Sequence, residues 1–142
     1  MTTIYHQLRN NAVALISLVV ALGSLSYNTW RNERTEYNRN IRTAAFELLG
    51  KLAELERVAF LAHYDRDKSA GNPRTGWTYV LVIRDLSTLV PAPVPARAAE
   101  LQSVWGANWE QLGRDDEMAV TRIDDAIGSV REATLTTLKS LR

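Results

Sequence analysis

Residues 41–62, IRTAAFELLGKLAELERVAFLA, carry the pattern that decides the fold. Apolar side chains recur there at alternating spacings of four and three residues: Ile41, Ala45, Leu48, Leu52, Leu55, Ala59 and Ala62. This spacing aligns these seven side chains on one face of an α-helix, as in coiled coils and helical bundles. Three further residues widen the apolar face: Ala44, Leu49 and Phe60. We predict that the helix ends near Lys68, because Gly71 and Pro73 follow.

Upstream of this helix lies an uncharged apolar segment, residues 12–27 (AVALISLVVALGSLSY). As a helix it is about 24 Å long, and residues 28–30 extend it to about 28 Å, close to the roughly 30 Å thickness of the hydrocarbon core of a bilayer. Tyr27 and Trp30 suit the interface between lipid and water. We therefore predict one transmembrane anchor over residues 12–30, after a short N-terminal tail, residues 1–11. Two alternatives stay open, a cleaved signal peptide and the core helix of a soluble protein.

One face of the predicted anchor carries small side chains at spacings of three, four and three residues: Ala14, Ser17, Ala21 and Ser24. Small side chains at this period let two helix backbones approach closely in lipid, where packing drives association. We interpret this face as a contact with another membrane helix, which belongs either to a partner protein or to a second copy of the chain.

The anchor is followed by a polar segment, residues 31–40, which contains no Gly or Pro and is predicted to be a helical stalk. Three of its arginines are predicted to contact anionic lipid head groups: Arg31, Arg34 and Arg39. Together with Arg42 they make this flank more basic than the N-terminal flank, which holds Arg9. The positive-inside rule therefore predicts an inner (plasma) membrane protein with its bundle in the cytoplasm. A periplasmic bundle is the alternative.

The rest of the sequence predicts three further helices. Residues 76–90 are rich in strand-forming side chains, but the chain offers no second strand to pair with them. We therefore predict a helix, with Thr75 as its N-cap. Three prolines within residues 91–95 predict an extended connector. It is followed by a predicted helix over residues 96–112.

The last predicted helix runs from an acidic first turn, residues 115–117, to the C-terminus. It carries a second apolar seam: Val120, Ile123, Ile127, Val130, Thr134, Leu138 and Leu141. These helices predict an all-α fold. We expect residues 41–142 to form an antiparallel bundle of about four helices, whose first helix continues from the single transmembrane helix.

Composition and motifs exclude several classes of function. The net charge is +1, and residues 41–142 carry 13 basic and 14 acidic side chains, so we expect no nucleic-acid partner. The chain has no cysteine and no phosphate-binding loop or nucleophile motif. His63, Asp65 and Asp67 are spaced like metal ligands, but we interpret them as the polar end of a helix. We therefore expect no enzyme activity, no metal and no cofactor.

Four residues of the second half are candidate contacts with a partner or a ligand: Arg74, Trp77, Trp105 and Trp109. The first two lie in an unusual segment, residues 71–77 (GNPRTGW), where an arginine could bind a carboxylate or a phosphate. Trp105 and Trp109 are spaced four residues apart, about one helical turn. Each tryptophan is interpreted either as core packing or as part of a contact surface.

Two functions fit this organisation. The first is an accessory or scaffold subunit, embedded in membrane lipid, that acts through contacts with a membrane protein partner or a second copy of the chain. The second is a sensor or a module that binds a small molecule. In layout alone, the chain is similar to the membrane-tethered four-helix sensing domains of bacterial receptors. That resemblance implies ligand binding, but the sequence up to Arg142 shows no second membrane helix and no signalling domain, which favours the subunit.

Overall fold

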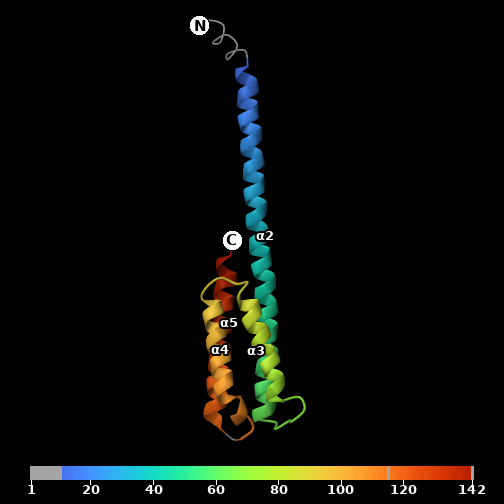
Figure 1. The fold of residues 1–142 in the computed structure, drawn as a ribbon, viewed down its shortest axis with the longest axis vertical. Coiled ribbons are helices and arrows are strands. Elements are labelled where there is room, and N and C mark those ends of the chain that lie inside the picture. The colour runs from blue at the N-terminus through green and yellow to red at the C-terminus, as the bar shows by residue number, and fades with distance from the viewer. Residues whose placement is uncertain (1–10, 115, 142) are drawn as a thin grey trace. The chain divides into compact units, whose positions relative to one another are not determined.

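The computed structural model describes residues 11–114 and 116–141 (Figure 1). These residues form four α-helices and one short 3-10 helix, without a strand among them: α2 (Ala12–His63), α3 (Pro73–Ser87), α4 (Val94–Asn108), η1 (Trp109–Gln111) and α5 (Glu117–Ser140). The all-α prediction is confirmed, and residues 76–87 are helical. The predicted N-terminal tail, including Arg9, lies outside the described residues except for Asn11.

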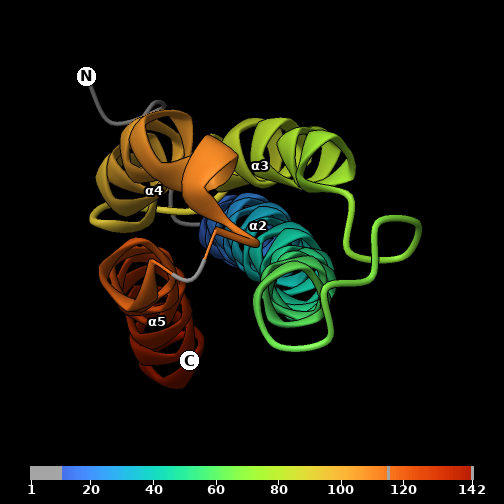
Figure 2. The ribbon, with the colours of Figure 1, turned by 90° about the horizontal axis from the view of Figure 1, so that it is seen from below.

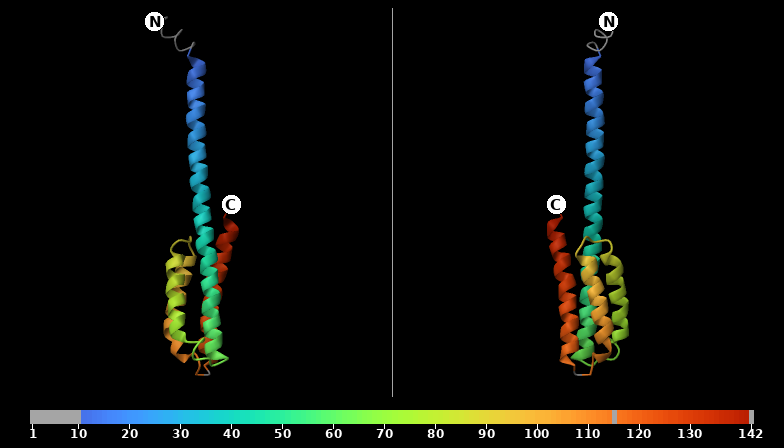
Figure 3. Two further views of the ribbon diagram at one scale, coloured as in Figure 1. Left: turned by 90° about the vertical axis from the view of Figure 1, so that its right-hand side faces the viewer. Right: turned by 60° about the vertical axis from the view of Figure 1, so that its left-hand side comes forward.

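The chain divides into two units, residues 1–37 and residues 38–142, and the boundary falls within the predicted stalk. We call residues 38–142 the helical domain. Seen end-on, α4 lies between α3 and α5, and the part of α2 that belongs to the domain lies beside α3 and α5 (Figure 2). The side views show the same four helices alongside one another (Figure 3). Apolar side chains from all of them fill the interior.

The core of the helical domain follows the predicted seams closely. All seven residues of the α2 seam are buried, from Ile41 to Ala62. In the α5 seam, the residues from Val120 to Thr134 are buried, and Leu138 and Leu141 are half-buried. The alternating spacing of four and three residues therefore identified the core correctly. Phe60 is the exception, because its side chain is 52% exposed and lies outside the core.

The ends of α2 and α3 differ from the predicted ones. α2 ends at His63 rather than near Lys68, because the following loop folds back on the helix: the Asp67 backbone N–H donates to the Leu61 carbonyl oxygen at 3.0 Å. α3 begins at Pro73, and its N-cap is Asn72 rather than Thr75. The Asn72 side-chain oxygen accepts a hydrogen bond from the Arg74 backbone N–H at 3.0 Å. Proline is favoured at the first helical position, which explains the earlier start.

The two later helices also begin and end differently from the prediction. Pro95 lies in the first turn of α4, which starts at Val94, so the predicted extended connector shrinks to a few residues of turn. α4 ends at Asn108, and η1 follows it. α5 begins after Asp116, whose carboxylate accepts from the backbone N–H groups of Met118 and Ala119 at 3.1 Å each. The predicted acidic start of this helix is confirmed, except that Asp115 lies outside the described residues.

Gly71 allows the loop after α2 to pack against that helix. A Cβ atom at this position would meet the backbone nitrogen of Ala62, the carbonyl carbon of Leu61 and the carbonyl oxygen of Asp67. Backbone atoms cannot move aside like the end of a flexible side chain. We expect Gly71→Ala to lower the free energy of unfolding by about 1–3 kcal/mol, measured by thermal or denaturant unfolding.

Gly128→Ala is the matched control for this prediction. Gly128 lies within α5, and no heavy atom lies within 4 Å of a Cβ built there. Because alanine is the better helix former, this variant should be up to about 1 kcal/mol more stable than the wild type. If the two variants changed stability in the same direction, the packing described around Gly71 would be wrong.

Candidate functional site

The apolar segment of α2 is the most unusual surface among the described residues. Of the helices that the structure describes, only α2 is long and apolar enough to cross a membrane, judged by length and composition, and none of its 18-residue apolar window is buried. Its large side chains are open, with Val13, Val19 and Leu25 exposed by 76%, 69% and 65%. Soluble monomers rarely expose a continuous apolar surface of this kind. Among the described residues, this segment is therefore the candidate for a membrane span.

Two hydroxyl groups within residues 12–30 donate hydrogen bonds to backbone carbonyl oxygens of the same helix. The Ser17 hydroxyl donates to the Val13 carbonyl oxygen at 2.8 Å, and the Thr29 hydroxyl donates to the Leu25 carbonyl oxygen at 3.0 Å. Helical backbone groups likewise bond to one another, which is the arrangement that lipid requires. Ala14, Ser17, Ala21 and Ser24 are all exposed, so the small-residue face is open to a neighbour. Its role as a helix contact stays a prediction.

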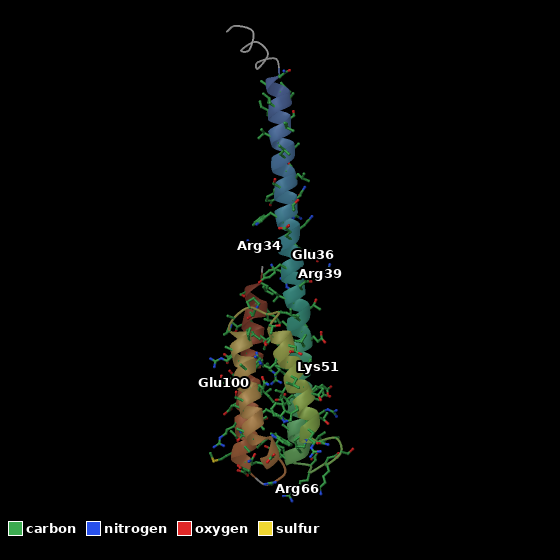
Figure 4. All side chains as sticks on the ribbon, in the orientation of Figure 1. Arg34, Glu36, Arg39, Lys51, Arg66 and Glu100 are labelled. Carbon is green, nitrogen blue, oxygen red and sulfur yellow. The ribbon has the colours of Figure 1, made fainter. Side chains whose placement is uncertain are left out.

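Aromatic and basic side chains follow the apolar segment directly. The rings of Tyr27 and Trp30 have their centroids 6.1 Å apart, and the Arg34 guanidinium carbon lies 5.6 Å from the centroid of the Trp30 ring. Arg31 and Arg34 are exposed on this part of α2, and Arg39, which is also exposed, belongs to the helical domain (Figure 4). An aromatic and cationic collar of this kind suits the head-group region of a bilayer. Contact of these arginines with lipid stays a prediction.

Trp105 is a core residue, which corrects its interpretation as a partner or ligand contact. Its side chain is fully buried. Gly76, in the first turns of α3, packs directly on the indole ring, and a Cβ there would overlap it. Trp77 is half-buried beside Gly106 of α4, and Trp109 is half-buried in η1 against the core. Only the open edges of Trp77 and Trp109 can therefore meet a partner.

Arg74 is exposed and lines a surface cavity of about 430 Å³ between the loop after α2 and the loop before α5. Arg66 and Lys68 also line this cavity. The acidic side chain among the lining residues, Asp67, accepts hydrogen bonds from the backbone of its own loop. Hydrogen bonds from the backbone N–H groups of Ala70 and Ser69 hold the pKa of the Asp67 carboxyl below its usual 3.8. The cavity is thus lined by three basic side chains and one ionised carboxylate, and the role of Arg74 as a contact stays a prediction.

Sequence reasoning missed a polar contact between α2 and α5. The Arg131 guanidinium donates to both carboxylate oxygens of Glu56, at 2.6 and 3.4 Å, and the two residues are 75 positions apart. Asp124 lies near this pair. Partial burial raises the pKa of the Asp124 carboxyl above 3.8, and the carboxylates of Glu56 and Asp125 raise it further, whereas His63 opposes the shift. Among the described residues, no three His, Cys, Asp or Glu side chains converge in a way that could hold a metal ion.

The raised pKa of Asp124 predicts how stability depends on pH. The folded state holds the Asp124 proton more tightly than the unfolded state, whose pKa is near 3.8. The stabilisation from protonation is therefore complete below that pH and is lost as the pH rises through the raised folded-state value. We expect Asp124→Asn to have a higher melting temperature than the wild type at pH 7, and no advantage at pH 3. Glu132→Gln, at an exposed site on the same helix, should change neither value. A loss of stability in Asp124→Asn at pH 7 would contradict this assignment.

Compared with protein-family models, with curated proteins and with solved structures, the chain matches none of them. The function must therefore be argued from the surfaces described above.

Proposed function

We propose that this protein is a single-pass membrane protein, in which residues 12–30 hold an antiparallel helical bundle at the inner (plasma) membrane. There it serves as an accessory or scaffold subunit that acts through protein–protein contacts. The observation that carries the proposal is the exposure of the apolar segment: no charged residue occurs between Arg9 and Arg31, and none of the apolar window is buried. In lipid this surface is stable, and in water it would promote aggregation.

The exposure of the segment favours an anchor over the core helix of a soluble protein. A core helix buries its apolar face against neighbouring elements, whereas Val13, Val19 and Leu25 are each more than half exposed. The cleaved signal peptide is the remaining rival. Against it stands the continuity of α2, which runs from Ala12 to His63 without a break.

The basic residues after the segment support a cytoplasmic bundle. Arg31, Arg34, Arg39 and Arg42 all lie within 15 residues of its end, a range over which such charges set orientation. A reporter that is active only in the cytoplasm, fused after Arg142, should be active, and one that is active only in the periplasm should be inactive. The reverse result would place the bundle in the periplasm.

The role as a subunit is tested by purification from native membranes in a mild detergent, with mass spectrometry of the proteins that accompany the chain. We expect one membrane protein at a fixed ratio, or a second copy of the chain. Replacing Ala21 and Ser24 together with leucine should reduce this association, because larger side chains keep the helix backbones apart. Val20→Leu, next to them, is the matched control. A chain that is recovered alone and monomeric would contradict the proposal.

The alternative function, a membrane-tethered ligand-binding module, draws support from the cavity lined by Arg66, Lys68 and Arg74. Its positive lining suits a small anionic ligand. Titration with phosphate and with simple dicarboxylates, followed by NMR or calorimetry, tests this function. Arg74→Ala should weaken any binding at the cavity, and saturable binding that depends on Arg74 would favour the sensor over the subunit.

A further inference from the structure

The side of α2 opposite the core carries a second regular pattern, which we call the outer seam. Its residues recur at spacings of four, three, four, three and four residues: Phe46, Gly50, Ala53, Arg57, Phe60 and Tyr64. The last residue of the outer seam, Tyr64, directly follows α2, and its backbone N–H still bonds to the Phe60 carbonyl oxygen at 2.9 Å. All six are exposed. The buried seam residue Leu48 is two positions from both Phe46 and Gly50, which places it about 200° around the helix. The outer seam therefore faces away from the helical domain.

The outer seam exposes large aromatic side chains around a small-residue centre. Phe46, Phe60 and Tyr64 are exposed by 64%, 52% and 60%. The rings of the last two are packed together, with centroids 4.9 Å apart. At Gly50, no heavy atom lies within 4 Å of a Cβ built there. An alternation of four and three residues along one exposed helix face is the pattern that another helix with the same repeat can match.

We propose that the outer seam is the contact between two copies of this chain, which pair through parallel α2 helices. The parallel arrangement rests on the proposed function, because two copies anchored in one membrane with the same orientation direct their α2 helices the same way. In coiled-coil notation, Gly50, Arg57 and Tyr64 then occupy a positions. Phe46, Ala53 and Phe60 occupy d positions, so that each residue meets its own counterpart in the second copy.

One pair of charges beside the outer seam is complementary in this arrangement. In a parallel pair, a side chain at position g lies beside the side chain five residues later, at position e, of the other helix. Arg42 is at g and Glu47 is at e, so each Arg42 meets Glu47 of the second copy, and the contact occurs twice by symmetry. One Nη of Arg42 donates to the Leu141 carbonyl oxygen at 3.0 Å, and a guanidinium carries five N–H donors in all. An antiparallel pair would instead bring the e positions, Glu47 and Glu54, toward one another.

Arg57 weakens the association of the two copies. Two copies of Arg57 meet at an a position, where their like charges repel. Each is partly compensated by the Glu54 carboxylate of its own chain, 3.5 Å from the Arg57 Nε. Arg57→Leu replaces this repulsion with an apolar contact, so the two copies should associate at least about tenfold more tightly.

Cysteine cross-linking of the full chain in native membranes tests the pairing, because the chain contains no cysteine of its own. Ala53→Cys places two thiols at facing d positions, within the distance that a disulfide spans. Thr136→Cys, at an exposed position on α5, reports random encounters of anchored chains. We expect oxidation to yield at least about fivefold more dimer from Ala53→Cys. Equal yields, or a larger yield from Thr136→Cys, would overturn the proposal.

Two variants of Ala53→Cys identify the contact surface. Phe60→Glu adds a charge to the outer seam, and Leu135→Glu adds one to α5, where Leu135 is 41% exposed. Both side chains lie outside the core, so both variants should keep the helical content of the wild type, measured by circular dichroism. We expect the cross-link to be lost with Phe60→Glu and kept with Leu135→Glu. Loss in both, or in neither, would mean that the outer seam is not the contact.

A charge exchange tests the register. Arg42→Glu alone should weaken cross-linking through Ala53→Cys. The combination of Arg42→Glu with Glu47→Arg should restore the cross-linking. If the combination failed to restore it, the parallel register would be excluded.

The fraction of the chain in the membrane is measured in the same samples. A chain that cross-links but is not in the membrane contradicts the anchor proposal alone, whereas a chain that stays in the membrane without a seam-specific cross-link contradicts the pairing alone.

Discussion

Replacing Trp105 with alanine should lower the free energy of unfolding by about 3–5 kcal/mol, the range for large-to-alanine changes at fully buried aromatic sites. The ring is fully buried, and it packs against Gly76 of α3. Its loss leaves a cavity between two helices that backbone shifts cannot close. Since a domain of this size is stable by roughly 5–15 kcal/mol, this loss is between about a fifth and all of the free energy of unfolding. Denaturant unfolding of the full chain in mild detergent, followed by far-UV circular dichroism, measures the change.

Two controls distinguish core packing from other effects of Trp105. Trp105→Phe keeps most of the ring volume and removes an indole N–H that makes no hydrogen bond with the described residues, so its loss should be below about 2 kcal/mol. Trp109→Ala removes a half-buried ring and should lower stability less than Trp105→Ala. A larger loss in Trp109→Ala than in Trp105→Ala would contradict the assignment of Trp105 to the core.

Two arginines in the middle of the apolar segment should release the protein from the membrane. Val20 and Leu22 lie near the centre of residues 12–30, and both side chains are exposed. A charged side chain at the centre of a membrane helix costs about 2.5–3.5 kcal/mol, so the pair Val20→Arg and Leu22→Arg costs about 5–7 kcal/mol. We expect most of this variant in the soluble or aggregated fraction after cell lysis and ultracentrifugation, whereas the wild type stays in the membrane pellet.

The matched control for this variant adds the same charge at the edge of the segment. Asn28→Arg with Asn32→Arg puts two arginines where their long side chains can reach the head groups, and it should stay in the membrane. If both double variants left the membrane, general destabilisation would explain the result. If the central variant stayed in the pellet as an integral protein, the apolar segment would not be the anchor.

The sequence predicted the helices and their buried faces because packing and spacing determine both. The seam from Ile41 to Ala62 is a periodic signal over three heptads, and every residue of it is buried. Helix ends were predicted less well because single hydrogen bonds decide them. Asn72, rather than Thr75, caps α3, and the loop bond from Asp67 to Leu61 ends α2 before Lys68. Such bonds depend on loop geometry that spacing does not encode.

The candidate site was less predictable than the fold. Trp105 and Trp109 look alike in sequence, but Trp105 is fully buried and packs against Gly76, whereas Trp109 is half-buried. The pair of Glu56 and Arg131 joins positions that no local pattern connects. The outer seam did have a local signal, the spacing from Phe46 to Tyr64. In the sequence this signal is ambiguous, because Phe60 also fits a widened core face.

Extraction of native membranes with alkaline carbonate tests the central claim most directly. Carbonate removes proteins that are held to membranes by charge or by other proteins and leaves those whose helices cross the lipid. We predict that the intact chain, with residues 12–30 still attached as verified by mass spectrometry, stays in the pellet. Recovery in the supernatant, or of a chain that lacks its first two dozen or so residues, would contradict the account.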